Sequence, residues 1–494
     1  MRNEVLRLEK VTLREQGVTQ LDNFNLHIFE GEIMGLVPVD THGLSTLCDL
    51  LRENLPLYYG YVFYRERLIN TWRSPQPRYN RISVIQAKSC LVDGLTVADN
   101  IFVLRPGFRG RLMRPSAFRR QLTPFMESIG IRIDTDARVE DLGAFERFVV
   151  ELLKAVVAGS RLIVLNEIST LINESELDKL HAILRHYAAE GFSFLYVCFH
   201  FEELLKLCDR TAVMMRGRVV KLLEGEEMVP QSLLPYSAAY EQMVASQLAR
   251  GANRPGNEVF RARFPVGDGA LRFSVRAGEC LVLQDLDNHF IDGFLAALTD
   301  GRAPAGAELL LCGTAPRGGR DRRMAVIEDQ PGRTMIFPGM SYLENLCFTM
   351  DHRMKALWRS SRVRRGLKSA YAQWLGPDLL ERRVEDLSET ERCELVYHRV
   401  LLQRPEVVFC VQPFRMADVA MRMRIWRLLE ELLDKGVAVV ILAVNLADSL
   451  SLADRLIRVR RGRPQEEFDR VHFNDLPTDA PWLNLYRGDE SSTK

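Results

Sequence analysis

Residues 35–47 read GLVPVDTHGLSTL, which follows the outline of a phosphate-binding loop, G-x-x-x-x-G-K-[S/T]. A loop of this kind wraps backbone N–H groups around a phosphate, its lysine bridges two phosphates, and its hydroxyl holds Mg²⁺. Gly43, Ser45 and Thr46 stand in the expected order, but Leu44 occupies the lysine position. Because leucine has no donor, the pattern predicts a phosphate loop that has lost its chemistry.

The overall composition is that of a soluble globular protein. At 494 residues the chain is long enough for two or more domains, each with its own core. Hydrophobic residues make up 47% and charged residues 27%, which is ordinary for a globular protein. Lys and Arg number 66 against 65 Asp and Glu, so no net field attracts nucleic acid. We therefore expect no nucleic-acid partner.

The same sequence lacks the features of a secreted or membrane-spanning chain. The longest apolar run, 437–444, is far shorter than the roughly 20 residues of a membrane helix. Met1 leads almost directly into a strand-like alternation, which leaves no room for a signal peptide. Nine cysteines are scattered singly and never as C-x-x-C, which argues against zinc and against a disulfide framework. We expect a cytoplasmic protein with reduced cysteines in its core.

Several short sequence features recur in the same order at nearly constant spacing. Gly31-Glu32 returns 247 residues later as Gly278-Glu279. Three further features return 245 residues later: Asp209-Arg210 as Asp454-Arg455, Gly217-Arg218 as Gly462-Arg463, and Leu142 as Leu387. The chain is therefore interpreted as two copies of one domain of about 225 to 245 residues.

Turn-forming residues indicate where one copy ends and the next begins. We assign residues 1–226 to the first domain, 227–257 to a linker rich in proline and glycine, and 258–494 to the second domain. Within each copy, apolar strand-like runs such as 162–165 alternate with helical stretches such as 176–190. This alternation predicts an α/β fold with a mostly parallel sheet.

These residues resemble the ATP-binding subunits of ATP-binding cassette (ABC) importers, most closely the fused double-cassette subunit of the ribose/galactose-type sugar importers. The resemblance covers nearly the whole chain and is carried by the segments 11–36, 91–105, 150–170, 201–220, 384–388 and 446–463. It implies two tandem P-loop NTPase domains, each with a parallel sheet core and a helical subdomain. It also implies ATP and Mg²⁺ as ligands, held in two composite sites between one copy's phosphate loop and the other copy's LSGGQ signature.

The first composite site keeps part of the family's residues. The resemblance places Ser45 at the Mg²⁺-ligating hydroxyl and Glu167 at the catalytic base, while Asn166 replaces the metal-orienting aspartate. The opposing signature, LSETE at 387–391, keeps Ser388 and loses both glycines. The candidate nucleotide-binding residues are Gly43, Ser45, Thr46 and Ser388, the candidate metal ligand is Ser45, and the residual catalytic candidate is Glu167.

Three further family positions of this site hold unsuitable residues. The adenine-stacking aromatic corresponds to Glu15, the glutamine to Ala87 and the switch histidine to Phe199. Gln86 and His200 are each one residue away, which in a strand is the opposite face. Glu167 alone cannot position phosphate or metal, so hydrolysis is not expected.

The second composite site departs further from the family. Its loop, 285–292, reads DLDNHFID, with Ile291 at the lysine position and Asp292 at the hydroxyl position. Its carboxylates would repel a polyphosphate by about 1 kcal/mol each at 4 Å in water. Val411 and Gln412 replace the aspartate and the catalytic glutamate, and Phe145 fills a glycine position of the signature LGAFE at 142–146. We expect no ATP at this site.

Structural roles are the alternative for each of these residues. Glu167 can close a buried strand, and residues 43–46 can simply begin a helix, with weak anion binding at that helix start left open. Gln86 and His200 are interpreted as surface polar residues. The arginine-rich stretches 105–120 and 353–365 are interpreted as solvated faces of the helical subdomain.

The lost groups predict a non-hydrolysing double-cassette protein, a pseudo-ATPase, that acts as a scaffold or regulatory subunit related to sugar import and binds ATP and Mg²⁺ weakly or not at all. Segment 95–102, LTVADNIF, is retained, and in this family it lies beside the surface that docks membrane subunits. The expected partners are permease subunits or an active cassette homologue at the inner face of the plasma membrane. The alternatives are a working ATP-binding subunit of a carbohydrate importer and, more remotely, a sensor that reuses the cleft for another small molecule.

Overall fold

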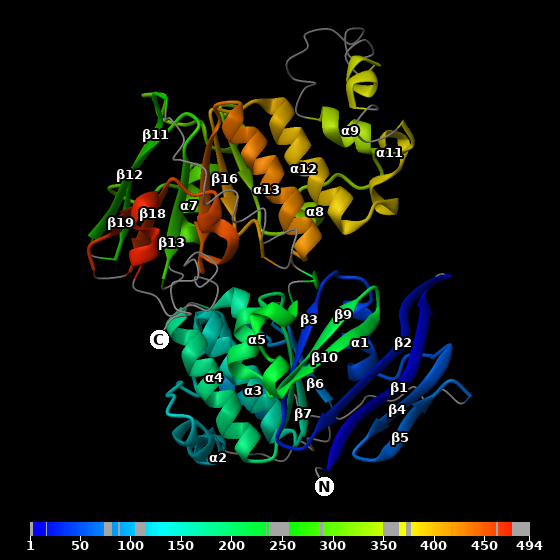
Figure 1. The fold of residues 1–494 in the computed structure, drawn as a ribbon. Coiled ribbons are helices and arrows are strands. Elements are labelled where there is room, and N and C mark those ends of the chain that lie inside the picture. The colour runs from blue at the N-terminus through cyan, green and yellow to red at the C-terminus, as the bar shows by residue number, and fades with distance from the viewer. Residues whose placement is uncertain are drawn as a thin grey trace. The chain divides into compact units, whose positions relative to one another are not determined.

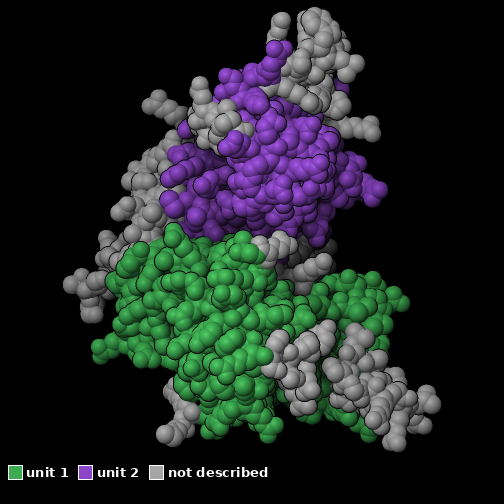
Figure 2. Space-filling model, turned by 90° about the vertical axis from the view of Figure 1, so that its right-hand side faces the viewer, with its two compact units in different colours: residues 1–239, 478–485 green, residues 240–477, 486–494 purple. Residues whose placement is uncertain are grey.

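The computed structural model describes residues 3–15, 17–73, 82–86, 89–103, 115–172, 174–233, 235–236, 256–267, 269–286, 290–348, 365–371, 377–415, 417–460 and 463–476. These residues form two compact units, unit 1 within residues 1–239 and unit 2 within residues 240–477, which are coloured separately in Figure 2. Each unit contains an antiparallel sheet, a mostly parallel sheet and helices that cover them.

Unit 1 begins with a four-stranded antiparallel sheet in the order β2-β1-β4-β5. Its strands are β1 (Glu4–Glu15), β2 (Val18–Phe29), β4 (Tyr59–Tyr64) and β5 (Arg67–Thr71). Along β1 and β2 apolar side chains alternate with polar ones, so one face is buried and the other is wet. This pattern is typical of a sheet that packs one of its two faces against a core.

The second sheet of unit 1 has six strands in the order β10-β9-β3-β8-β7-β6. All neighbours are parallel except β9 and β10. Its strands are β3 (Ile33–Pro38), β6 (Ile82–Gln86), β7 (Leu162–Asn166), β8 (Ser193–Val197), β9 (Arg210–Met215) and β10 (Arg218–Glu224). Strands β3 and β8 are buried along their whole length, as expected for parallel strands with both faces covered.

The helices of unit 1 named next, except α2, pack against strands of this parallel sheet (Figure 1). They are α1 (Leu44–Arg52), α2 (Pro115–Ser128), α3 (Ala144–Val157), α4 (Glu174–Ala189) and α5 (Phe201–Leu207), with a π-helical turn at Asp99–Val103 and 3₁₀ turns at Val139–Asp141, Ile168–Leu171, Gly225–Glu227 and Pro230–Leu233. Helix α1 belongs to the main core, which joins both sheets through residues such as Leu8, Leu47 and Leu195. The loop that leads into α1 is therefore anchored from two sides.

Unit 2 repeats this architecture. Its antiparallel sheet has the order β12-β11-β14, and its six-stranded sheet has the order β15-β16-β17-β13-β18-β19, parallel except for β18 and β19. The strands are β11 (Glu258–Val266), β12 (Gly269–Arg276), β13 (Cys280–Asp285), β14 (Glu308–Leu311), β15 (Met324–Ile327), β16 (Val407–Val411), β17 (Ala438–Ala443), β18 (Arg455–Val459) and β19 (Glu466–Asp469). Replacing each strand by its counterpart converts the order of one parallel sheet into that of the other.

Helix α7 of unit 2 takes the place that α1 has in unit 1. The helices are α7 (Ile291–Thr299), α8 (Pro331–Thr334), α9 (Tyr342–Cys347), α11 (Pro377–Glu381), α12 (Glu389–Gln403) and α13 (Val419–Asp434), with 3₁₀ turns at Gly318–Arg320, Val384–Asp386, Ala447–Ser451 and Arg470–Asp475. Phe294 of α7 packs edge-on against Phe264 and Phe409 at centroid distances of 5.3 and 5.8 Å. The core of this unit thus also joins its two sheets through the helix that follows the loop.

The residues that reveal the sequence repeat make the same contacts in both units. Glu32 pairs with Arg210 at 2.6 Å, and Glu279 pairs with Arg455 at 2.6 Å. The preceding aspartates, Asp209 and Asp454, each accept a backbone N–H at the start of the central strand, both at 2.9 Å. The prediction of an α/β fold with a mostly parallel sheet in each half is confirmed. The boundaries at residues 226 and 258 stay a prediction.

Among the described residues, no helix is both long enough and apolar enough to span a membrane. The arginine-rich stretches 105–120 and 353–365 lie largely outside the described residues, so their interpretation as solvated faces stays a prediction.

Candidate functional site

The first loop, residues 35–47, leads from β3 into α1 through Gly43. Gly43 precedes the helix with φ of 77°, a left-handed conformation that favours glycine. A Cβ at this position would lie 2.2 Å from the carbonyl oxygen of Gln20 in β2, and a Cβ at Gly217 would lie 2.1 Å from the same oxygen. The glycine is therefore required by the close approach of β2, with or without a phosphate.

The lysine position of the first loop belongs to the hydrophobic core. Leu44 is 6% exposed and is part of the same apolar cluster as Leu47 and Leu21. Ser45 is exposed, whereas Thr46 is buried and its hydroxyl donates to Glu15 at 3.3 Å. The candidate residues Gly43, Ser45 and Thr46 thus lie together at the helix start, but a carboxylate faces one of the two hydroxyls.

A second carboxylate lies within the first loop. Asp40 accepts the backbone N–H of His42 at 3.1 Å and that of Arg216 at 2.9 Å. The His42 ring makes a 2.8 Å hydrogen bond with the Thr19 carbonyl, which ties the loop to β2. An amide that a phosphate loop would offer to its ligand is therefore already bonded to an acid of the same chain.

Asn166 and Glu167 follow at the end of β7. The Asn166 Oδ1 atom is buried and makes no hydrogen bond with the described part of the chain. Glu167 is 1% exposed, and its Oε1 accepts the backbone N–H of Phe199 at 2.9 Å. Its own backbone has φ of 57°, and its N–H donates to Val197 at 3.0 Å. The carboxylate thus connects the ends of two neighbouring strands.

The positions beside Glu167 differ from expectation in one respect. Phe199 is buried in the main core, and Gln86 at the end of β6 is half-buried. The interpretation of His200 as a surface residue is wrong, because it is only 8% exposed. It precedes α5, whose first turn is covered by the core, and a strand alternation does not apply beyond the strand end. Ala87 lies outside the described residues.

A buried polar cluster that sequence reasoning missed lies close behind these strand ends. Glu203 of α5 is fully buried and accepts hydrogen bonds from the Tyr196 hydroxyl and, at 3.4 Å, from the Cys198 thiol. His181 of α4 lies 3.4 Å from the same carboxylate. Burial raises the pKa of Glu203, but His181 and Tyr196 outweigh burial, so this pKa lies below its ordinary value. Burial also raises the pKa of the Cys198 thiol.

The second loop, residues 285–292, follows β13 and leads into α7. Ile291, at the lysine position, is 4% exposed and belongs to the core of unit 2. The buried carboxylate of Asp285 accepts the backbone N–H groups of Phe290 at 2.8 Å and Ile291 at 3.2 Å. Asp292 is exposed. Residues 287–289 lie outside the described residues.

Gln412 occupies in unit 2 the position that Glu167 has in unit 1. It follows β16 with φ of 42°, and its backbone N–H donates to Leu442 at 2.9 Å. Leu442 stands 245 residues after Val197, which accepts the corresponding bond in unit 1. The left-handed backbone at this strand end is therefore present in both units, although only one of them keeps the acid.

The signature residues begin helices. Ser388 precedes α12, its hydroxyl accepts the Glu391 N–H at 3.2 Å, and Glu391 accepts the Ser388 N–H at 2.7 Å. Burial raises the pKa of Glu391, but hydrogen bonds from Ser388 and the charge of Arg382 lower it on balance. In unit 1, Gly143 takes the serine's place. The expected pairing of Ser388 with the first loop stays a prediction.

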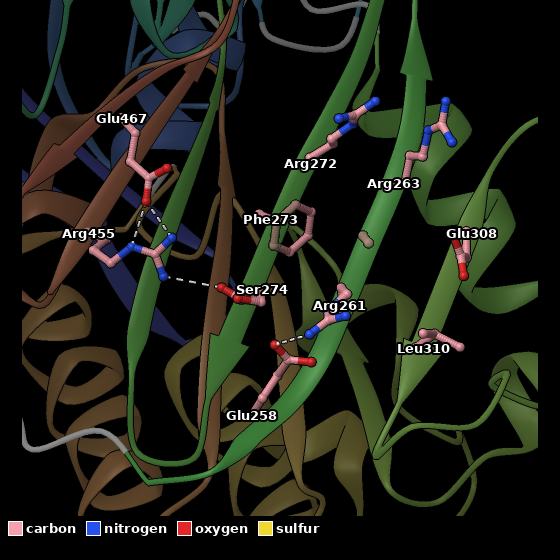
Figure 3. A pocket seen from close by; sticks show the side chains of 11 residues that line it. Glu258, Arg261, Arg263, Arg272, Phe273, Ser274, Glu308, Leu310, Arg455 and Glu467 are labelled. Carbon is pink, nitrogen blue, oxygen red and sulfur yellow. Dashed lines mark hydrogen bonds and ion pairs between the residues drawn. The ribbon is translucent and has the colours of Figure 1, made fainter.

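A separate pocket of about 380 Å³ lies on the antiparallel sheet of unit 2 (Figure 3). Arg263 of β11 and Arg272 of β12 are direct neighbours in the register, and both line it. Arg261 pairs with Glu258 at 3.0 Å and Arg455 pairs with Glu467, so part of its charge is neutralised. Its lining includes no residue of the second loop. This pocket is therefore distinct from the position at which a phosphate loop would hold its ligand.

Comparison with known proteins shows which family and which proteins the chain is similar to. A family model described as ABC transporter matches residues 21–170. A ribose import ATP-binding protein of Rubrobacter xylanophilus is 26% identical over 96% of this chain and 98% of its own length. A putative ribose/galactose/methyl galactoside import ATP-binding protein of Agrobacterium fabrum is 27% identical over 98% of each chain. Residues 21–170 therefore match the ABC transporter family, and nearly the whole chain is similar to these sugar-import ATP-binding proteins.

The match to relatives over nearly their full length agrees with two cassettes in one chain. A xylose import ATP-binding protein of Geobacillus kaustophilus is also similar, at 22% identity over 95% of this chain and 97% of its own length. The family match, 21–170, spans the first loop and the end of β7. The resemblance inferred from the sequence, a double-cassette ABC subunit of the sugar-importer type, is thus confirmed.

Several residues of the two loops differ in type from those with which a phosphate loop holds Mg-ATP. Both lysine positions, Leu44 and Ile291, are core residues without a donor. Asp40 and Asp285 place negative charge on loop amides, where like charge opposes a phosphate. The orphaned Asn166 oxygen is neutral, so it lacks the charge that orients a metal. Among the described residues no group of three acidic, histidine or cysteine side chains could hold a metal ion.

Proposed function

We propose that this ABC protein is a double-cassette subunit related to carbohydrate import that does not hydrolyse ATP and acts as a scaffold or regulator. One observation carries the proposal. In both units the lysine position of the phosphate loop is a buried aliphatic residue, and a carboxylate of the same chain accepts an amide of the loop region. ATP and Mg²⁺ therefore bind weakly or not at all.

The segment that the family uses beside its membrane partners is held by the same side-chain hydrogen bonds in both units. Asn100 is fully buried, accepts the Val92 N–H at 2.8 Å and donates to the Val92 carbonyl at 3.1 Å. Asn345 makes the same two bonds to Phe337, at 2.8 and 3.1 Å. These bonds hold the loop ahead of the helical turn in one shape. They support a docking face that survives the loss of catalysis.

The partners that we propose follow from this face and from the relatives. The similar proteins are named for ribose, galactose and xylose import. We infer that this subunit associates with permease subunits of such an importer, or with an active cassette homologue, at the inner face of the plasma membrane.

A working ATP-binding subunit is the second candidate. It is favoured by Glu167, which stands at the position of the catalytic base and is oriented by its bond with Phe199. In this case the chain would energise a carbohydrate importer despite Leu44. The two candidates differ in one measurable property, because only the second turns over ATP through Glu167.

A turnover assay on the purified full chain, with permease subunits present, separates the candidates. We expect ATP hydrolysis by the wild-type chain to equal that of Glu167→Gln, and permease co-purification to be unchanged by Mg-ATP. Turnover that Glu167→Gln abolishes would overturn the proposal and establish the second candidate. Failure to co-purify with any permease or cassette subunit would overturn the scaffold role.

A further inference from the structure

The second loop contains a carboxylate that accepts hydrogen bonds from a helix start, as a bound phosphate would. Asp285 is the last residue of β13 and is 2% exposed. One oxygen, Oδ2, accepts both the Phe290 N–H at 2.8 Å and the Ile291 N–H at 3.2 Å. Phe290 precedes α7 and Ile291 is its first residue, so both donors belong to the helix start. In Figure 1, β13 and α7 are found in the green part of unit 2.

The start of a helix attracts anions for two reasons. Its first N–H groups have no partner within the helix, and the aligned peptide dipoles place partial positive charge there. Phosphate loops use this position to hold a phosphate group. A carboxylate that accepts two of these N–H groups satisfies the same donors and neutralises the same charge. Asp285 therefore does for α7 what a phosphate does in a working loop.

Because these groups are buried, the carboxylate and the N–H groups of the helix start depend on each other for hydrogen bonds. A carboxylate at 2% exposure is costly unless it is hydrogen-bonded, and buried N–H groups are costly when they lack an acceptor. Phe290 and Ile291 are themselves only 3% and 4% exposed, so water does not readily replace the acid. The acid and the helix start each supply what the other needs.

In unit 1, the N–H groups near the helix start have other acceptors. Pro38 stands 247 residues before Asp285 and has no carboxylate. There Asp40 accepts the N–H of His42, which precedes the helix, and the Leu44 N–H donates to the Thr41 carbonyl. The direct closure of the helix start by an acid of the central strand is a property of the second loop.

We propose that Asp285 is a built-in anion that closes the second loop against phosphate ligands. The proposal concerns α7 and its own strand. It holds whether or not the first loop turns over ATP, so the turnover assay on Glu167→Gln and the experiments on Asp285 fail independently.

Hydrogen exchange in the full-length chain tests the proposal, with Asp285→Ala as the variant and Asp292→Asn as the matched control. Asp292 lies on the same helix turn and its substitution removes the same charge, but its side chain is exposed. We expect the Phe290 and Ile291 amides to exchange about tenfold faster or more in Asp285→Ala, because their acceptor is lost. In Asp292→Asn the exchange of these two amides should match the wild type.

Inorganic pyrophosphate is the second probe. It should raise the thermal midpoint of Asp285→Ala and slow exchange at residues 290 and 291, while the wild type and Asp292→Asn show no response. An equal response of wild type and Asp285→Ala, or unchanged exchange in Asp285→Ala, overturns the proposal. If Asp285→Ala does not fold, Asp285→Asn decides: exchange faster than in Asp292→Asn supports the proposal, and equal exchange overturns it.

Discussion

His181 of α4 lies 3.4 Å from the carboxylate of Glu203 in α5, and both side chains are buried. Unit 2 has a counterpart, in which Arg422 of α13 lies 3.3 Å from Asp448, also buried. Asp448 stands 245 residues after Glu203. In each unit, a buried acid–base pair therefore connects two helical segments that flank one strand. The pair connects α4 to α5 around β8 in unit 1, and α13 to the turn Ala447–Ser451 around β17 in unit 2.

Glu203→Gln should destabilise unit 1 in a pH-dependent manner. Removing one partner of a buried pair costs about 3–5 kcal/mol. The folded-state pKa of Glu203 lies below its ordinary 4.5, so its stabilising effect is present above about pH 4.5 and is lost as pH falls through the lower folded value. Urea unfolding of unit 1, followed by hydrogen exchange at pH 7 and pH 4, measures this. A difference between wild type and variant that does not shrink at pH 4 contradicts the assignment, and Asp448→Asn should leave unit 1 unchanged.

Gly43→Ala tests whether the glycine of the first loop serves chain packing. The left-handed backbone costs an alanine about 1–2 kcal/mol, and the contact with Gln20 adds about 1–3 kcal/mol of overpacking. Gly159 has φ of 78°, and no atom lies within 4 Å of the point that an added methyl group would occupy, so Gly159→Ala should show the backbone cost alone. Chemical denaturation without nucleotide compares the two. Equal losses would show that the close approach of β2 does not constrain Gly43.

Leu44→Lys restores the motif's lysine on paper but should not restore nucleotide binding. Leu44 is 6% exposed among apolar neighbours, so an ammonium group there is buried without a partner. We expect a loss of about 3 kcal/mol or more in stability, against less than about 1.5 kcal/mol for Leu44→Met. Thermal unfolding and titration with a fluorescent ATP analogue measure both properties. A stable Leu44→Lys chain that binds the analogue tightly would show that the side chain can face the loop.

Ser388 should act as a helix cap. Ser388→Ala removes the acceptor for the Glu391 N–H and should cost about 1 kcal/mol, whereas Ser388→Asp keeps an acceptor and should remain near wild type. The free energy of unfolding of unit 2 measures the difference. If Ser388→Asp were as unstable as Ser388→Ala, the hydroxyl would not be acting as a cap.

Much of the fold could be predicted from the chain itself because duplication leaves pairs of residues with the same structural task. Glu32 and Arg210 recur as Glu279 and Arg455, and both pairs connect the start of a central strand to its neighbour. Regular spacing of apolar residues then predicts the alternating strands and helices between them. The loss of the motif lysine was equally visible in the sequence, since it depends on residue type alone.

The hydrogen bonds that the two loops make within the chain could not be predicted. That Asp285 bonds the start of α7, or that Asp40 bonds His42, depends on backbone positions several residues away. The burial of His200 follows from the packing of α5, which the strand alternation before it does not report. The pair His181 and Glu203 is separated by 22 residues and carries no motif. Short-range patterns specify elements, whereas these contacts arise from their assembly.

Glu167 and Gln412 both have a left-handed backbone, each at the corresponding strand end of its unit. A side chain other than glycine in this conformation costs about 1–2 kcal/mol, and strain of this kind is commonly taken as a sign of an active centre. Here the same bend ends a strand in both halves, at φ of 57° and 42°, although Gln412 is no acid. The bend is therefore a property of the architecture that both halves share, and it does not depend on an acid at that position.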